Sequence, residues 1–141
     1  MTTAQINIVK ETWLSVAALD PVVVGNLFYN KLFEIAPELK PMFRGNQDEQ
    51  SRKLLSMLNY VIRKLDSLEE ILDEVAKLAQ RHVKYGVEES HYATVAAALL
   101  WTLEQGLGEA WTVDVRQAWI ICYATLSGAM IAASRYSATN V

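Results

Sequence analysis

The chain has 141 residues, the length of one domain, and 52% of them are hydrophobic, which is enough to form a sizeable core. The formal net charge is −3 and the basic residues form no stripe, so the composition argues against a nucleic-acid partner. The single cysteine, Cys122, excludes an internal disulfide framework. We predict one domain over residues 1–141.

A charge-free run from Ala118 to Ser134 requires a test for a membrane span. It covers 17 residues, fewer than the ~20 that a spanning helix needs, and it contains polar residues such as Thr125. A long helix buried over most of its surface fits this run better. The N-terminus lacks the basic and apolar segments of a signal peptide. We therefore expect a cytoplasmic protein without a membrane span, either a monomer or a homodimer that buries its apolar surplus.

The residue pattern in the first third of the chain predicts two helices. Apolar residues recur at three- and four-residue steps between Ile6 and Ala17, as on one face of an amphipathic helix. Asp20 followed by Pro21 is typical of a helix start, because the aspartate caps free N–H groups and proline suits the first helical position. Pro37 ends this second helix, since proline disfavours the helical conformation in the residue before it.

The remaining two thirds of the chain are also expected to be helical. Ser67 and Glu70 have the spacing of a capping box, which would begin a helix at that point. The predicted elements are a helical turn over 37–43 and helices over about 48–65, 67–86, 90–107 and 112–135. No segment has the alternating pattern of a strand. The sequence therefore predicts an all-α domain of about seven helices.

The two histidines of the chain, His82 and His91, are the first candidates for chemistry. Without a nearby cluster of cysteines or carboxylates they do not form a structural zinc site. His82 follows Leu78 by four residues and so lies on or beside an apolar helix face. Taken alone, it is better explained as a structural histidine bonded to a carbonyl. It could also be the single protein ligand of a haem iron, for which one imidazole suffices because the porphyrin supplies four nitrogens.

Segments spread over nearly the whole chain carry a family resemblance. In chain order they are Trp13, Leu27-Phe28-Tyr29, Leu32-Phe33, Pro37, Phe43, Gln50 to Leu54, Arg81-His82, Tyr85-Gly86-Val87, His91-Tyr92, Trp119 and Tyr123. Together they resemble the globins, in particular the flavohaemoglobins and single-domain bacterial haemoglobins. The resemblance implies a globin fold around a haem b pocket.

The same resemblance implies roles for individual residues. These are His82 as the iron ligand, Phe43 packed on the porphyrin, Tyr29 and Gln50 as hydrogen-bond donors to a ligand on the distal side, Leu54 in the same cavity, Lys53 at a haem propionate, and Val87, Tyr92 and Val95 on the proximal side. Three of these residues could instead have ordinary structural roles. Tyr29 could be a core tyrosine, Gln50 a solvated residue of a first helical turn, and Lys53 a surface lysine.

One position departs from the flavohaemoglobin pattern. Where that subgroup places a glutamate beside the proximal histidine, this chain has Ser134, with Ala133 next to it. A ligand histidine is tuned by the group that bonds its second nitrogen. The departure therefore weakens the expectation of peroxidase-like activation and favours reversible ligand binding.

Three functions are compatible with these observations. The first is a haemoglobin that binds dioxygen, and also carbon monoxide and nitric oxide, for storage, transport or sensing. The second is a nitric oxide dioxygenase that forms nitrate and depends on a separate reductase, because no flavin or nicotinamide domain follows. The third is a helical interaction domain without haem, which would leave the joint spacing of Phe43, Gln50, Leu54 and His82 unexplained.

Overall fold

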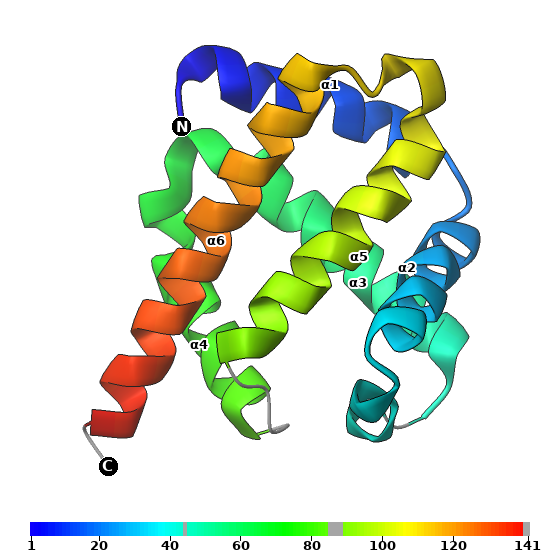
Figure 1. Ribbon diagram of the computed structural model, residues 1–141. Coiled ribbons are helices and arrows are strands. Elements are labelled where there is room, and N and C mark those ends of the chain that lie inside the picture. Colours follow the sequence, from blue (N-terminus) through cyan, green and yellow to red (C-terminus); the bar gives the residue numbers. More distant parts are fainter. Residues whose placement is uncertain (44, 85–88, 140–141) are drawn as a thin grey trace.

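The computed structural model describes residues 1–43, 45–84 and 89–139, with the backbone alone described at 84, 89 and 134–139. Every regular element in these ranges is helical, which confirms the all-α prediction. The elements are α1 (Thr3–Ala17), α2 (Pro21–Ile35), η1 (Pro37–Met42), α3 (Gln47–Arg63), η2 (Leu65–Ile71), α4 (Leu72–Lys84), α5 (Glu89–Leu107), η3 (Gly108–Ala110) and α6 (Val113–Thr139), where η marks a 3-10 helix (Figure 1).

The starts of the helices follow from local capping. The Asp20 side chain accepts a hydrogen bond from a backbone N–H at the start of α2, and Pro21 occupies the first turn, as predicted. Asn46 caps α3 in the same way, and Thr112 accepts from the backbone N–H of Val115 at the start of α6. Each cap satisfies a donor that a helix end leaves without a partner.

The capping box predicted at Ser67 and Glu70 is wrong. Ser67 lies inside η2 with a non-helical backbone conformation, φ −139° and ψ 46°, and its N–H donates to the carbonyl of Lys64 at 2.9 Å. The Glu70 carboxylate lies 3.5 Å from the Lys64 ammonium instead. Leu65 and Ile71 are both buried and anchor the two ends of this segment, so tertiary packing overrides the local signal. α4 consequently begins later than predicted.

The main core lies between α1, α3, α5 and α6. Trp13 and Trp119 face each other across it with ring centroids 6.1 Å apart. Cys122 is buried in the same cluster as a free thiol, as its apolar surroundings predict. α6 extends four residues beyond its predicted end at 135, to Thr139, and runs along α4 and α1 (Figure 1).

α2 and α3 approach each other very closely where they cross. A Cβ atom placed on Gly25 would lie only 2.2 Å from the Cβ atom of Ser51. No side chain fits at that distance, so glycine is required at position 25. This crossing fixes the position of α3 relative to α2.

Within the described residues, no single helix is long and apolar enough to cross a bilayer. The pair α1 and α2 meets the criteria of length and composition only when taken together, and the chain bends by 108° between them.

Candidate functional site

An aromatic cluster forms where α2 turns into η1. Tyr29 is 6% exposed, and its ring centroid lies 5.3 Å from that of Phe43 and 6.1 Å from that of Phe33. Leu54 from α3 and Val95 from α5 pack against the same group of side chains. The structure thus brings together four residues that the globin resemblance assigned to one pocket, and it draws them from four separate parts of the chain.

The local sequence explains how Phe43 reaches this cluster. Pro37 opens η1 and Pro41 lies within it, so the chain turns tightly directly after α2. Phe43 ends the turn with an extended backbone, and its N–H donates to the carbonyl of Lys40 at 3.1 Å. The turn therefore directs the Phe43 ring back toward Tyr29 on α2.

The hydroxyl group of Tyr29 has an uncommon environment. Burial raises the pKa of this phenol to about 12, because an apolar environment disfavours the charged phenolate. The hydroxyl forms no hydrogen bond with any side chain or backbone group of the described residues. No buried side-chain oxygen or nitrogen of the described residues lacks a hydrogen-bond partner, so the Tyr29 oxygen keeps some contact with solvent. The ring is therefore buried in an apolar wall, whereas its protonated hydroxyl has no acceptor among the described residues.

His82 lies near the end of α4 and is half-buried. Its Nδ1 atom is 2.7 Å from the carbonyl oxygen of Leu78, one helical turn earlier. A carbonyl can only accept, so Nδ1 carries the proton. In the neutral ring the lone pair is then on Nε2, which is the atom that can coordinate a metal. This geometry agrees with both interpretations of the sequence, since a ligand histidine also needs such an orienting bond.

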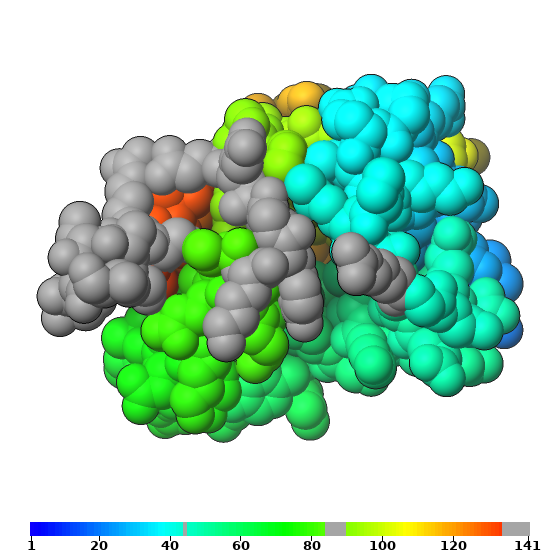
Figure 2. Space-filling model, turned by 90° about the horizontal axis from the view of Figure 1, so that it is seen from below, coloured from blue at the N-terminus to red at the C-terminus, as the bar shows by residue number. Residues whose placement is uncertain are grey.

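The last turns of α4, which carry His82, and the corner between α2 and η1, which carries the aromatic cluster, lie apart from each other. Both views show this separation (Figure 1, Figure 2). Within the described residues no group of three or more histidine, cysteine or acidic side chains could hold a metal ion. A single imidazole is a donor set that suits haem, whose porphyrin supplies four iron ligands.

The other predicted site residues differ in their exposure. Gln50 is half-buried and Lys53 is exposed, both on α3. Tyr92 is half-buried near the start of α5. Val87 lies outside the described residues. The roles of these four residues, like those of the other predicted site residues, stay predictions.

α6 carries a half-buried tyrosine, Tyr123, and also the position at which the globin resemblance leads one to expect an acid. The Tyr123 hydroxyl donates to the backbone carbonyl of Tyr92 at 2.5 Å and so ties α6 to α5. Burial and the nearby Tyr92 raise the pKa of Tyr123 well above its usual range. Ala133 is half-buried on the same helix, and the side chain of Ser134 lies outside the described part of the chain. A methyl group at 133 cannot orient an imidazole.

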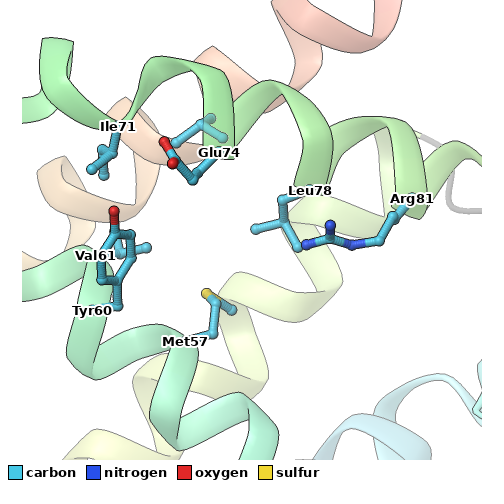
Figure 3. A pocket seen from close by; sticks show the side chains of 8 residues that line it. Met57, Tyr60, Val61, Ile71, Glu74, Leu78 and Arg81 are labelled. Carbon is cyan, nitrogen blue, oxygen red and sulfur yellow. The ribbon is translucent and has the colours of Figure 1, made fainter.

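A small cavity lies between α3 and α4 (Figure 3). It measures about 80 Å³ and is lined by apolar side chains including Met57, Val61 and Leu78, with Glu74 and Arg81 nearby. Cofactor sites usually measure at least ~300 Å³, so this cavity is not the cofactor site. A larger hollow of about 380 Å³ lies between α5 and α6 and is lined mostly by small and apolar residues.

Sequence reasoning missed several residues around the site. Phe33 stacks beside Tyr29, and its spacing of four residues from Tyr29 was the available signal. Gly25 permits the crossing of α2 and α3, and an isolated glycine inside a helical pattern often marks such a close approach. Asn26 of α2 forms side-chain hydrogen bonds with residues of α3. No sequence signal predicted these bonds, because they depend on how the two helices cross.

Comparison with known proteins identifies relatives over most of the chain. The globin family profile matches residues 26–130. Neuroglobin of Chaenocephalus aceratus is 28% identical over 137 residues, which cover 87% of this chain and 86% of that protein. Neuroglobin-1 of Oncorhynchus mykiss is 27% identical over 144 residues, covering 92% and 90%.

Solved structures show the same fold. A bacterial globin from Campylobacter jejuni superposes with a TM-score of 0.85 at 27% identity, covering 98% of this chain and 99% of that one. An engineered carbene transferase from Rhodothermus marinus, provisionally named a nitric oxide dioxygenase, gives 0.87 at 22% identity, with coverage of 99% and 96%. A hexacoordinated haem protein from an anhydrobiotic tardigrade gives 0.84 at 15% identity, with coverage of 96% for both chains. The last two likenesses concern the fold alone.

Proposed function

Because this chain belongs to the globin family, we propose that it holds haem b through His82 and binds dioxygen reversibly between Tyr29 and Gln50. Family membership supports haem binding and a diatomic gas as ligand. The identity of the iron ligand, the choice of dioxygen and the roles of the distal residues are our proposal. A cytoplasmic location and the choice between monomer and homodimer stay predictions from the sequence.

Haem, when bound, would supply a ferrous iron that takes up a diatomic gas. The chain's own contribution begins with His82. The 2.7 Å contact between Nδ1 and the Leu78 carbonyl selects one tautomer and sets the orientation of the ring. Nε2 is thereby presented as a neutral donor. A carbonyl is a weaker acceptor than a carboxylate, so it leaves the imidazole only modestly electron-donating.

The observation that best supports dioxygen as the ligand is the Tyr29 hydroxyl. This donor lies in an apolar wall, and burial raises its pKa to about 12. Its hydrogen has no acceptor among the described residues. Iron-coordinated dioxygen carries more partial negative charge than carbon monoxide does. A hydrogen bond from Tyr29 would thus stabilise dioxygen selectively, by about 0.5–1.5 kcal/mol for an ordinary bond and more for a charged acceptor.

The surrounding residues support binding rather than turnover. Phe33 and Phe43 contact the Tyr29 ring, and Leu54 packs against the same apolar cluster. Such apolar surface would limit the access of water and protons to the ligand. Ala133 cannot provide the carboxylate that would make His82 more electron-donating. Both features favour the reversible release of an unreacted ligand. A nitric oxide dioxygenase remains the alternative function, and its turnover would need electrons from a reductase.

The spectrum of the reconstituted protein tests the proposal. Haem added to the purified chain is expected to give a Soret band and a reversible shift with dioxygen. His82→Ala should abolish the ligand-dependent spectrum, whereas His91→Ala, a half-buried histidine on α5, should leave it unchanged. Retention of the parental spectrum by His82→Ala would show that another group binds the iron.

The dioxygenase alternative has its own test. The dioxygen-bound protein is mixed with nitric oxide, and the return of the ferrous state is followed in the presence of a cell extract that contains reductases. Slow or absent return supports ligand binding as the main function. Rapid return with nitrate formed in proportion would favour the enzyme.

A further inference from the structure

A network of polar side chains joins α2 to the first turns of α3. Asn26 is its centre: its Oδ1 accepts hydrogen bonds from Ser51 Oγ at 2.8 Å and from Gln47 Nε2 at 3.2 Å. Its Nδ2 donates to Asp48 Oδ1 at 3.1 Å. Gln47 also donates to Asn30 Oδ1, one turn further along α2, at 3.2 Å. Three residues of α3 are thus bonded to one side chain of α2.

This network lies at a crossing that has no spare room. Gly25 and Ser51 bring the two helices into direct contact, and Ser51 is completely buried. A buried hydroxyl requires an acceptor within the protein, and Asn26 provides it. Asn26 therefore fixes how far the start of α3 stands from α2 and in which register.

The same two segments carry the two distal donors of the proposed function. Tyr29 follows Asn26 by three residues on α2, and Gln50 immediately precedes Ser51 on α3. Any shift of the start of α3 along or away from α2 changes the separation of Tyr29 from Gln50. Two donors can share one diatomic ligand only if this separation is held within a fraction of an ångström.

We propose that Asn26 is a positioning residue for dioxygen binding, which holds the first turn of α3 so that Gln50 meets the ligand already bonded to Tyr29. This role rests on the proposed function of Tyr29 and Gln50. Asn26 does not touch the ligand. It acts through Ser51, Gln47 and the helix that carries Gln50.

The first variant to test is Asn26→Leu, which keeps the side-chain size and removes all three hydrogen bonds. Dioxygen is expected to dissociate about two- to tenfold faster from the ferrous holoprotein, as for the loss of one hydrogen bond. Carbon monoxide dissociation should change by less than about twofold, because that ligand attracts hydrogen bonds weakly. Asn59→Leu is the matched control, since Asn59 lies on α3 and its side chain accepts a hydrogen bond from Trp13 of α1. It should leave both rates unchanged.

Two further variants separate positioning from general loosening. In a Gln50→Leu background, Asn26→Leu should cause no additional change in the dioxygen dissociation rate, because its effect passes through Gln50. Asn26→Asp combined with Asp48→Asn keeps three hydrogen bonds and the net charge while it exchanges donor and acceptor. This pair should restore the parental rate. If Asn26→Leu does not yield holoprotein, Asn26→Asp alone replaces it, with a smaller increase expected from the repulsion between Asp48 and the new carboxylate.

The outcomes distinguish the two proposals. If Tyr29→Phe and Gln50→Leu both leave dioxygen dissociation unchanged, the proposed function fails whatever Asn26 does. If these two variants accelerate dissociation and the Asn26 variant does not, the positioning role is overturned. It is also overturned if the effects of Asn26→Leu and Gln50→Leu multiply, or if Asn59→Leu accelerates dissociation equally.

Discussion

The replacement Tyr29→Phe isolates the hydroxyl on which the proposed function depends. Phenylalanine keeps the ring contacts with Phe28, Phe33 and Phe43, whose centroids lie 5.1, 6.1 and 5.3 Å away. The hydroxyl itself has no hydrogen-bonding partner among the described residues. Its removal should therefore leave the free energy of unfolding of the haem-free chain nearly unchanged, because no hydrogen bond within the described residues is lost.

The effect on ligand binding should be larger. Loss of one hydrogen bond of about 0.5–1.5 kcal/mol corresponds to a roughly two- to twelvefold faster dissociation of dioxygen, since RT is about 0.59 kcal/mol. A stronger bond to a charged acceptor would extend this to about a hundredfold. Carbon monoxide dissociation should stay close to the parental rate. The dissociation rate is measured in a stopped-flow instrument by displacing dioxygen with excess carbon monoxide.

Tyr123→Phe provides the matched control. Burial also raises the pKa of Tyr123, but its hydroxyl donates to the backbone carbonyl of Tyr92. Its replacement should lower the free energy of unfolding by about 1 kcal/mol and leave dioxygen dissociation unchanged. An unaltered dissociation rate in Tyr29→Phe, or an equal acceleration in both variants, would refute the assignment of Tyr29 as the ligand's donor.

Two other predictions concern the core. Gly25→Ala should lower the free energy of unfolding, measured in urea, by about 3 kcal/mol, because the new Cβ would lie 2.2 Å from Cβ and 2.6 Å from Cα of Ser51. Gly128→Ala on α6 has no atom near its new Cβ and should instead raise it by about 0.5–1 kcal/mol, so equal effects would contradict the close crossing. Cys122 is 2% exposed, and burial raises the pKa of its thiol to about 12. Between pH 7 and 9 it should stay protonated and react with an aromatic disulfide reagent only after unfolding, and immediate reaction of the native protein would show that the thiol is accessible.

Local signals were sufficient to predict the helices. Periodicity gave the apolar faces of α1 and α2, and Asp20 with Pro21 marked the start of α2 correctly. The same kind of signal failed at Ser67, where the burial of Leu65 and Ile71 determines the winding of the chain. Capping is a weak local preference of about 0.5–2 kcal/mol, and the packing of two buried side chains exceeds it.

The candidate site was predictable only through its resemblance to globins. Composition and spacing left His82 undecided between a structural histidine and an iron ligand, and its bond to Leu78 suits both. The contact between Tyr29 and Phe43, and the packing of Val95 against the same cluster, join positions that are distant in the sequence, which periodicity cannot detect. The Asn26 network was not predicted at all, since its polar residues resemble a solvated helix face until the crossing of α2 and α3 is known.

Leu54 packs against both the main core and the aromatic cluster around Tyr29. One side chain therefore contributes both to the width of the ligand space and to the stability of the fold. A substitution at this position cannot change one property without affecting the other. Phe33 and Val95 contact the aromatic cluster without joining the main core. Substitutions that alter ligand access with little loss of stability should therefore be found at these two positions more often than at Leu54.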